Sequence, residues 1–200
     1  MTETSNYTAS ELLAVMSARL LLDGQIIFAG VGIPLFAATL AQRVHAPSLT
    51  ILFEGGVIGP FIVPGELPPS LTSSVCTRKA NMVLPITDVM LLLNAGISIG
   101  FMGGAQIDRY GNLNSSFIGD PEQPKIRFPG TGGGNDISSL TNMIVAMKQR
   151  NDVLCPGRLY HQPGFPRWRH IAGGCWPCLW RHVPVVTDLA IMGFDEQAKK

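Results

Sequence analysis

A short apolar run that ends in one acid and two glycines is the feature that most constrains the fold of this 200-residue chain. Residues 49–53 are Leu, Thr, Ile, Leu and Phe, and Glu54, Gly55 and Gly56 follow them directly. Such a run predicts a buried strand that delivers its last side chain to the edge of a sheet. Ligands of open α/β sheets bind at the carboxyl ends of the strands. Glu54 is therefore a candidate nucleophile, a candidate base, or an acid that caps backbone amides of the glycine turn.

The residues before this run have the pattern of a βαβ unit. Thr8 and Glu11 predict a capping box at the start of a helix, which Gly24 is expected to close. A strand over 25–29 and a helix over about 35–44 follow. This order predicts parallel strands with right-handed crossovers. The expected fold class is α/β, with an open, parallel-rich sheet flanked by helices.

The middle of the chain is less regular. The predicted elements are an irregular segment at 55–69, a helix at about 87–94 that ends at Gly96, a strand at 99–108 with a glycine break, a turn at 110–112, a short strand at 113–118, and a helix from Ile137 to about Lys148.

The composition excludes several classes of function. Charged residues make up 14% of the chain and hydrophobic residues 46%, against a typical charged fraction of about 25%. A surface so short of polar cover predicts an obligate interface with another subunit. The net charge of +1 gives no basic face for nucleic acid. No signal peptide and no apolar run long enough to span a membrane is visible, so we expect a cytoplasmic protein with reduced cysteines.

Glycines mark three further candidate sites. Gly30 and Gly32 follow the first predicted strand and present backbone amides that suit an anion, or they form only a tight turn. Gly103 and Gly104 could supply an oxyanion hole, although a bulge in a buried strand is the favoured explanation. The cluster at 130–134 is either a mobile loop beside a ligand or a flexible start to the next helix.

The segment from 151 to 183 departs from the rest of the chain. It contains all three Trp residues and no periodicity of a helix or strand. Its Cys and His residues fit a zinc site, or a redox Cys-x-x-Cys motif, only poorly in spacing and context, so no metal is expected. The residues concerned are His170, Cys175, Cys178 and His182.

Four motifs occur in order along the chain and together point to a family. They are FAGVGIP at 28–34, FEGGVIG at 53–59, FMGGAQID at 101–108 and PGTGGGND at 129–136. In this combination the chain resembles the β subunit of family I CoA-transferases, in the branch that contains the B subunit of glutaconate CoA-transferase. The similarity covers about residues 8–150 and 184–196. It implies the CoA-transferase and sugar-isomerase-like α/β fold, in one domain over residues 1–200.

The resemblance also implies a mechanism. The glutamate at the position of Glu54 attacks an acyl-CoA and becomes a γ-glutamyl-CoA thioester, which passes CoA to a carboxylic or dicarboxylic acid. Amides at Gly103, Gly104 and Ala105 would stabilise the oxyanions. The residues that would line the same pocket are Gly30, Gly32 and Gly55. Coenzyme A is then a substrate, with no permanently bound cofactor, and a separate α subunit completes the enzyme.

Two alternatives to this function, and one departure from the family, stay open. The first alternative is a CoA-dependent hydrolase of the ring-opening type, in which Glu54 acts as a general base on water. The second is a subunit that only scaffolds its partner. The departure is the segment 151–183, where family members are basic and charged, and which is interpreted as an out-of-frame reading or, less favoured, a divergent insertion. Family members also extend beyond the position of residue 200, so we expect a chain truncated relative to them.

Overall fold

A computed structural model describes residues 6–63, 65–108, 112–120, 122–149, 154–155 and 184–193. The helices are α1 (Ala9–Ala18), α2 (Ile33–Val44), α3 (Ile86–Leu91) and α4 (Gly134–Leu140), with 3₁₀ turns η1 (Ser74–Thr77) and η2 (Leu92–Ala95). The strands are β1 (Ile26–Ala29), β2 (Thr50–Leu52), β3 (Val57–Ile58), β4 (Met82–Val83), β5 (Ile99–Gly103), β6 (Gln106–Asp108), β7 (Leu113–Asn114), β8 (Phe117–Gly119), β9 (Pro124–Arg127), β10 (Asn142–Ala146), β11 (Leu154–Cys155), β12 (Val185–Val186) and β13 (Ile191–Met192).

The main sheet has the order β13-β12-β10-β5-β1-β2-β3-β4. Strands β12, β10, β5, β1 and β2 run parallel, whereas β13, β3 and β4 are antiparallel to their neighbours. The predicted βαβ unit is confirmed, because β1 and β2 are parallel and α2 connects them. The open, parallel-rich sheet predicted from the sequence is therefore confirmed.

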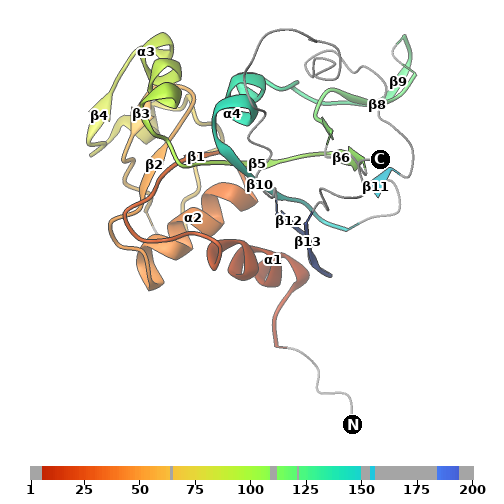
Figure 1. Cartoon of the computed structure of the whole chain (residues 1–200), viewed down its shortest axis with the longest axis horizontal. Helices are drawn as coiled ribbons and strands as arrows, with labels where there is room; N and C mark the ends of the chain where they lie inside the picture. The colour runs from red at the N-terminus through yellow and green to blue at the C-terminus, as the bar shows by residue number, and fades with distance from the viewer. Residues whose placement is uncertain are drawn as a thin grey trace, which may run out of the picture.

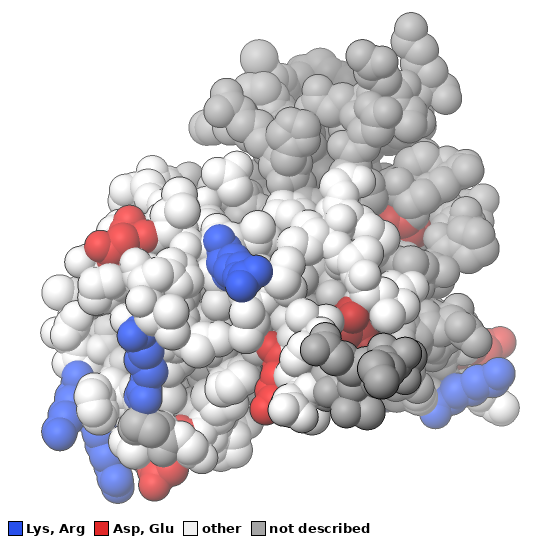
Figure 2. Space-filling model, turned by 90° about the horizontal axis from the view of Figure 1, so that it is seen from below, with Lys and Arg blue, Asp and Glu red and all other residues white. Residues whose placement is uncertain are grey.

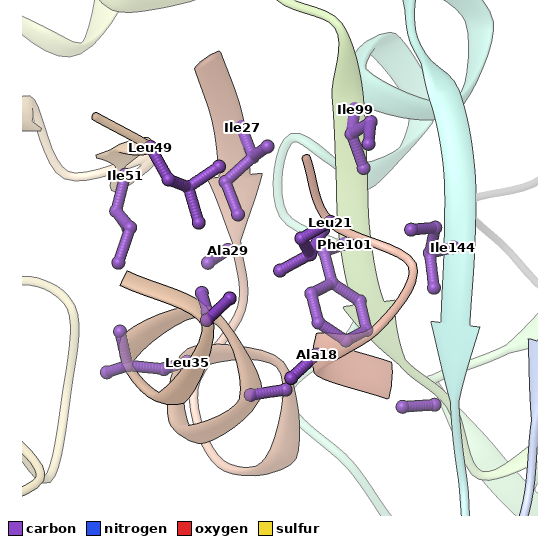
Figure 3. Packing of buried hydrophobic residues seen from close by; sticks show 14 of the residues in the cluster. Ala18, Leu21, Ile27, Ala29, Leu35, Leu49, Ile51, Ile99, Phe101 and Ile144 are labelled. Carbon is purple, nitrogen blue, oxygen red and sulfur yellow. The ribbon is translucent and has the colours of Figure 1, made fainter. Parts of the chain in front are cut away.

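Helices cover both faces of this sheet (Figure 1). Helices α1 and α2 pack together on one face, and η2 and α4 pack on the other. Alternate strand residues point to opposite faces. On β1, Ile27 and Ala29 therefore join the core cluster under α1 and α2, while Phe28 joins the cluster on the other face. Figure 3 shows the first cluster, with Leu35 of α2 and Phe101 of β5 in the same layer.

Helix α1 begins as the sequence predicts and ends earlier. The Glu11 amide donates to the Thr8 hydroxyl, and the Thr8 amide donates to the Glu11 carboxylate. The hydrogen bonds from the Thr8 backbone amide and hydroxyl lower the pKa of the Glu11 carboxyl below its ordinary value. The prediction that Gly24 closes the helix is wrong. The chain turns after Ala18, which places Leu21 fully in the core while Leu22 stays exposed.

Thr8→Ala is expected to lower the free energy of unfolding by about 1 kcal/mol, because it removes the side-chain acceptor at the helix start. Urea denaturation measures the effect. Ser10→Ala, in the first turn of the same helix but outside the capping box, is the matched control and should change stability much less. Equal losses in the two variants would argue against the capping box.

The predicted helix over 137–148 is the largest error of the sequence interpretation. Helix α4 ends at Leu140, and Asn142–Ala146 forms strand β10 between β5 and β12. Residues 143–146 are all buried, so the strand is apolar on both faces. Such a central parallel strand lacks the alternation that would distinguish it from a buried helix.

Three further predictions need correction. The segment 55–69 contains β3, which pairs with β2. The single strand predicted over 99–108 is two strands in different sheets, because β6 pairs with β7 and β11. The strand predicted over 113–118 is likewise divided into β7 and β8. By contrast, the helical segment before Gly96 is confirmed as α3 and η2, with Gly96 in the left-handed conformation.

Most of the atypical segment lies outside the described residues. Backbone pairing is described only for β11, which lies parallel to β6. The turn residues Tyr110 and Gly111 and the candidate zinc and redox residues also lie outside the described part. Within the described ranges, no helix is long and apolar enough to cross a membrane.

Candidate functional site

Three of the candidate segments lie at one edge of the main sheet. Strands β1, β2 and β5 are adjacent and parallel. Gly30 follows the end of β1, Glu54 follows β2 after one residue, and Gly103 ends β5. Carboxyl ends of neighbouring parallel strands lie at the same edge, which is where ligands of open α/β sheets bind. The structure thus places Glu54 at the same sheet edge as Gly30, at the end of the neighbouring strand, and Gly103, at the end of the strand beyond it.

Glu54 lies in the tight turn that joins β2 to β3. The Phe53 amide donates to the Val57 carbonyl at 2.8 Å, and the Gly56 amide donates to the Phe53 carbonyl at 3.0 Å. Gly56 has a φ of +105°, which favours glycine. These hydrogen bonds define the turn that carries Glu54 at the strand end.

The two glycines after Glu54 let neighbouring chain pack closely against the turn. A Cβ built on Gly56 would lie 2.0 Å from the Leu84 carbonyl oxygen. A Cβ built on Gly55 would lie 3.1 Å from both the Leu71 carbonyl oxygen and the Thr72 Cγ2. Neighbouring chain therefore fills the space that the missing side chains leave, which gives both glycines a packing reason.

The carboxylate of Glu54 is held by the loop that precedes α4. The Gly133 amide donates a 2.7 Å hydrogen bond to Glu54 Oε1 across 79 positions of sequence. A Cβ built on Gly132 would lie 2.9 Å and 3.0 Å from the two carboxylate oxygens. The loop can lie this close only because glycine occupies both positions. Glu54 is half-buried, and its carboxylate accepts a hydrogen bond from a backbone amide.

Gly133 was not among the site residues predicted from the sequence. The signal for it was present in the glycine cluster at 130–134, which was interpreted as a mobile loop beside a ligand or as a flexible helix start. Its contact with Glu54 joins the turn after β2 to the loop before α4, so it depends on the tertiary fold. The amide that binds Glu54 is not in the adjacent glycine turn, where the capping interpretation placed it.

Two of the other candidate amides are used within the fold. The Gly30 amide donates to the Phe101 carbonyl at 2.9 Å, and the Ala105 amide donates to the Asn114 carbonyl at 2.9 Å. Gly32 precedes α2 with a φ of +86°, so the sharp turn before this helix uses its conformational freedom. These contacts give Gly30, Gly32 and Ala105 a structural explanation independent of any ligand.

Gly103 and Gly104 lie where the chain leaves the main sheet. Gly103 ends β5 opposite Ala146 of β10 and is exposed. A Cβ on Gly104 would lie 2.2 Å from Leu113 Cδ1, so this glycine lets β7 approach the break between β5 and β6. The predicted bulge within one buried strand is therefore wrong, because the strand ends at Gly103 and the chain passes into another sheet at β6, while Gly104 has a packing reason.

The described residues do not bring together three or more His, Cys, Asp or Glu side chains in a possible metal site. Within the described residues, the Glu54 carboxylate meets the Gly133 amide and lies against the glycine loop at 132–133. Such an arrangement suits a carboxylate that attacks a carbonyl group, with an N–H donor beside it.

Comparisons with known proteins agree with the motif resemblance. The family model described as "Coenzyme A transferase" matches residues 10–152. The B subunit of glutaconate CoA-transferase from Acidaminococcus fermentans is 35% identical over 100% of this chain and 77% of its own length. The B subunit of 3-oxoadipate CoA-transferase from Pseudomonas knackmussii is 36% identical over 72% of this chain and 56% of its own length.

The fold comparison gives the same family. The crystal structure of glutaconate coenzyme A-transferase from Acidaminococcus fermentans superposes with a TM-score of 0.79 and 32% identity. The match covers 96% of this chain and 76% of the other chain. By its sequence, its motifs and its sheet, the chain belongs to the coenzyme A transferase family.

Proposed function

We propose that this chain is the subunit that carries the nucleophile of a CoA-transferase, and that Glu54 is that nucleophile. The observation that supports this role best is the position of its carboxylate. It lies at the carboxyl edge of the sheet, within 2.7 Å of the Gly133 amide nitrogen. The reaction moves CoA from an acyl-CoA to a carboxylic or dicarboxylic acid, and coenzyme A is a substrate.

The covalent steps balance without any further reagent. A Glu54 oxygen attacks the thioester carbonyl, the C–S bond breaks, and CoA thiolate leaves behind an acyl-glutamyl anhydride. The thiolate then attacks the glutamyl carbonyl and releases the donor carboxylate, which gives a γ-glutamyl-CoA thioester. The acceptor carboxylate repeats these steps in reverse and leaves as the new acyl-CoA. Glu54 is regenerated as a carboxylate, and no water is consumed.

The Gly133 amide has a role before and during attack. Its hydrogen bond to Oε1 orients the carboxylate and leaves Oε2 to attack the acyl carbon. When the thiolate later attacks the glutamyl carbonyl, charge develops on a Glu54 oxygen, and the same amide can donate to it. Gly32, Gly55, Gly103 and Gly104 remain proposed lining of the same pocket.

We further propose that an α subunit completes the enzyme. The two relatives in the sequence comparison are both named as B subunits of their enzymes. Figure 2 shows one face of the molecule on which uncharged side chains predominate and Lys, Arg, Asp and Glu are scattered. A surface with few charges suits burial against another protein. We propose the cytoplasm as the location of the complex.

Stoichiometry of thiol release tests this function. The chain is produced with its α partner and given an acyl-CoA and a carboxylate acceptor, after which free thiol and the new acyl-CoA are both measured. We expect each acyl-CoA consumed to appear as a new acyl-CoA, with little free thiol. Thiol release equal to acyl-CoA consumption would establish a hydrolase instead. No turnover with any acyl-CoA in a panel, with the partner bound, would favour a scaffold role.

A further inference from the structure

Two methionine side chains pack against the glycine loop that binds the Glu54 carboxylate. A Cβ built on Gly133 would lie 2.8 Å from Met90 Cε and 3.2 Å from Glu54 Oε1. A Cβ built on Gly134 would lie 2.7 Å from Met102 Cε. Two consecutive glycines therefore each contact a thioether methyl group, and one of them contacts the carboxylate as well.

The two methionines come from elements that the core fixes. Met90 lies on α3 and Met102 on β5, and both pack against the core cluster that contains Val89 and Ile137. The loop is thus held from a helix and from a central strand at once. Methionine suits this place because its unbranched, polarisable side chain fills irregular gaps.

Met90 and Glu54 Oε1 approach the same face of Gly133. A side chain in that position limits how water can approach the carboxylate from the loop side. It also limits how Gly133 can rotate, since the methyl already lies against the face of the glycine that is turned toward Oε1. Both effects matter most once a reactive glutamyl thioester has formed on Glu54.

We propose that Met90 and Met102 are positioning residues that hold Gly133 and Gly134 over Glu54 and thereby favour transfer of CoA over hydrolysis. This inference rests on the proposed glutamyl thioester. In hydrolysis, a water oxygen forms the new bond to the glutamyl carbonyl, the C–S bond breaks, and CoA leaves as a thiol while Glu54 is regenerated. In transfer, an acceptor carboxylate oxygen takes the place of the water.

Substitutions at Met90 separate the effect of side-chain volume from the effect of side-chain polarity. Met90→Ala opens the space beside Gly133 and Met90→Gln brings a polar group into it, whereas Met90→Leu keeps an apolar side chain of similar volume. We expect Ala and Gln to raise the ratio of free thiol to new acyl-CoA about tenfold, the scale of a small loss of positioning, and Leu to stay near wild type. Met102→Ala should act in the same direction. Met82→Ala is the matched control, because Met82 is 52% exposed on β4.

Hydrogen exchange of the Gly133 amide supplies a readout that does not need turnover. The complex with the α partner is used, and Met90→Ala is expected to speed this exchange while Met82→Ala leaves it unchanged. If Met90→Ala fails to fold, the thiol ratio and the Gly133 exchange rate are compared between Met90→Gln and Met90→Leu instead. Unchanged thiol ratio and unchanged exchange in the Met90 variants would overturn the inference while transfer by wild type still supports the proposed function. If wild type transfers no CoA, the proposed function fails. The inference that the two methionines favour transfer over hydrolysis then fails with it.

Discussion

Glu54→Gln is expected to abolish CoA exchange, with a loss of at least about 10³-fold, the scale seen when a covalent nucleophile is removed. The glutamine carbonyl can still accept the Gly133 hydrogen bond, so the fold and the loop should stay in place. A neutral amide does not attack the thioester, and therefore no acyl-enzyme forms. The measurement is the rate of acyl exchange between an acyl-CoA and a carboxylate, with the α partner bound.

Two controls separate chemistry from folding in this experiment. Glu66→Gln makes the same substitution at an exposed glutamate and should leave exchange unchanged. Glu54→Asp keeps the charge but withdraws the carboxylate by about one methylene length from Gly133, so exchange should also fall strongly. If Glu54→Gln kept the wild-type rate, Glu54 could not be the nucleophile.

Gly132→Ala is expected to lower exchange about 10²-fold, because its Cβ would lie 2.9 Å and 3.0 Å from the Glu54 carboxylate oxygens. Those oxygens cannot keep their position with a methyl group so close. The carboxylate is the flexible end of the side chain, so we expect it to move and the protein to remain folded. Exchange kinetics and thermal unfolding are measured on the same preparation.

Gly130→Ala is the matched control for this effect. Gly130 belongs to the same loop and has a φ of +97°, but a Cβ there would meet no atom within 4 Å. It should therefore show the strain of a left-handed alanine without the contact to Glu54. An equal loss of exchange in Gly130→Ala and Gly132→Ala would mean that loop strain, rather than displacement of the carboxylate, is responsible.

Local patterns predicted the parts of the fold that neighbouring residues determine. The capping box of Thr8 and Glu11 is confirmed because both partners lie within one helical turn. Strands β1 and β2 were predicted from apolar runs with glycine at their ends, and the parallel sheet followed from the helix between them. Strand β10 was missed because burial on both faces removes the alternation that identifies a strand.

The candidate site was predicted only in part for a similar reason. The position of Glu54 after a buried strand was sufficient to place it at the sheet edge. Its hydrogen bond to Gly133 joins segments 79 positions apart, and no local pattern specifies such a pair. The packing of Leu84 against Gly56 likewise depends on β4 lying beside β3. The sequence does not distinguish a glycine that allows close packing of another segment from a glycine that leaves space for a substrate.

Trapping of the covalent intermediate tests the central claim most directly. The complex of this chain with its α partner is incubated with an acyl-CoA and treated with hydroxylamine, which converts a glutamyl thioester to a hydroxamate. Peptides are then analysed by mass spectrometry. We expect the hydroxamate on Glu54 only when acyl-CoA is present, and none in Glu54→Gln. Continued turnover of acyl-CoA with Glu54 unmodified would contradict the proposal that this carboxylate carries CoA.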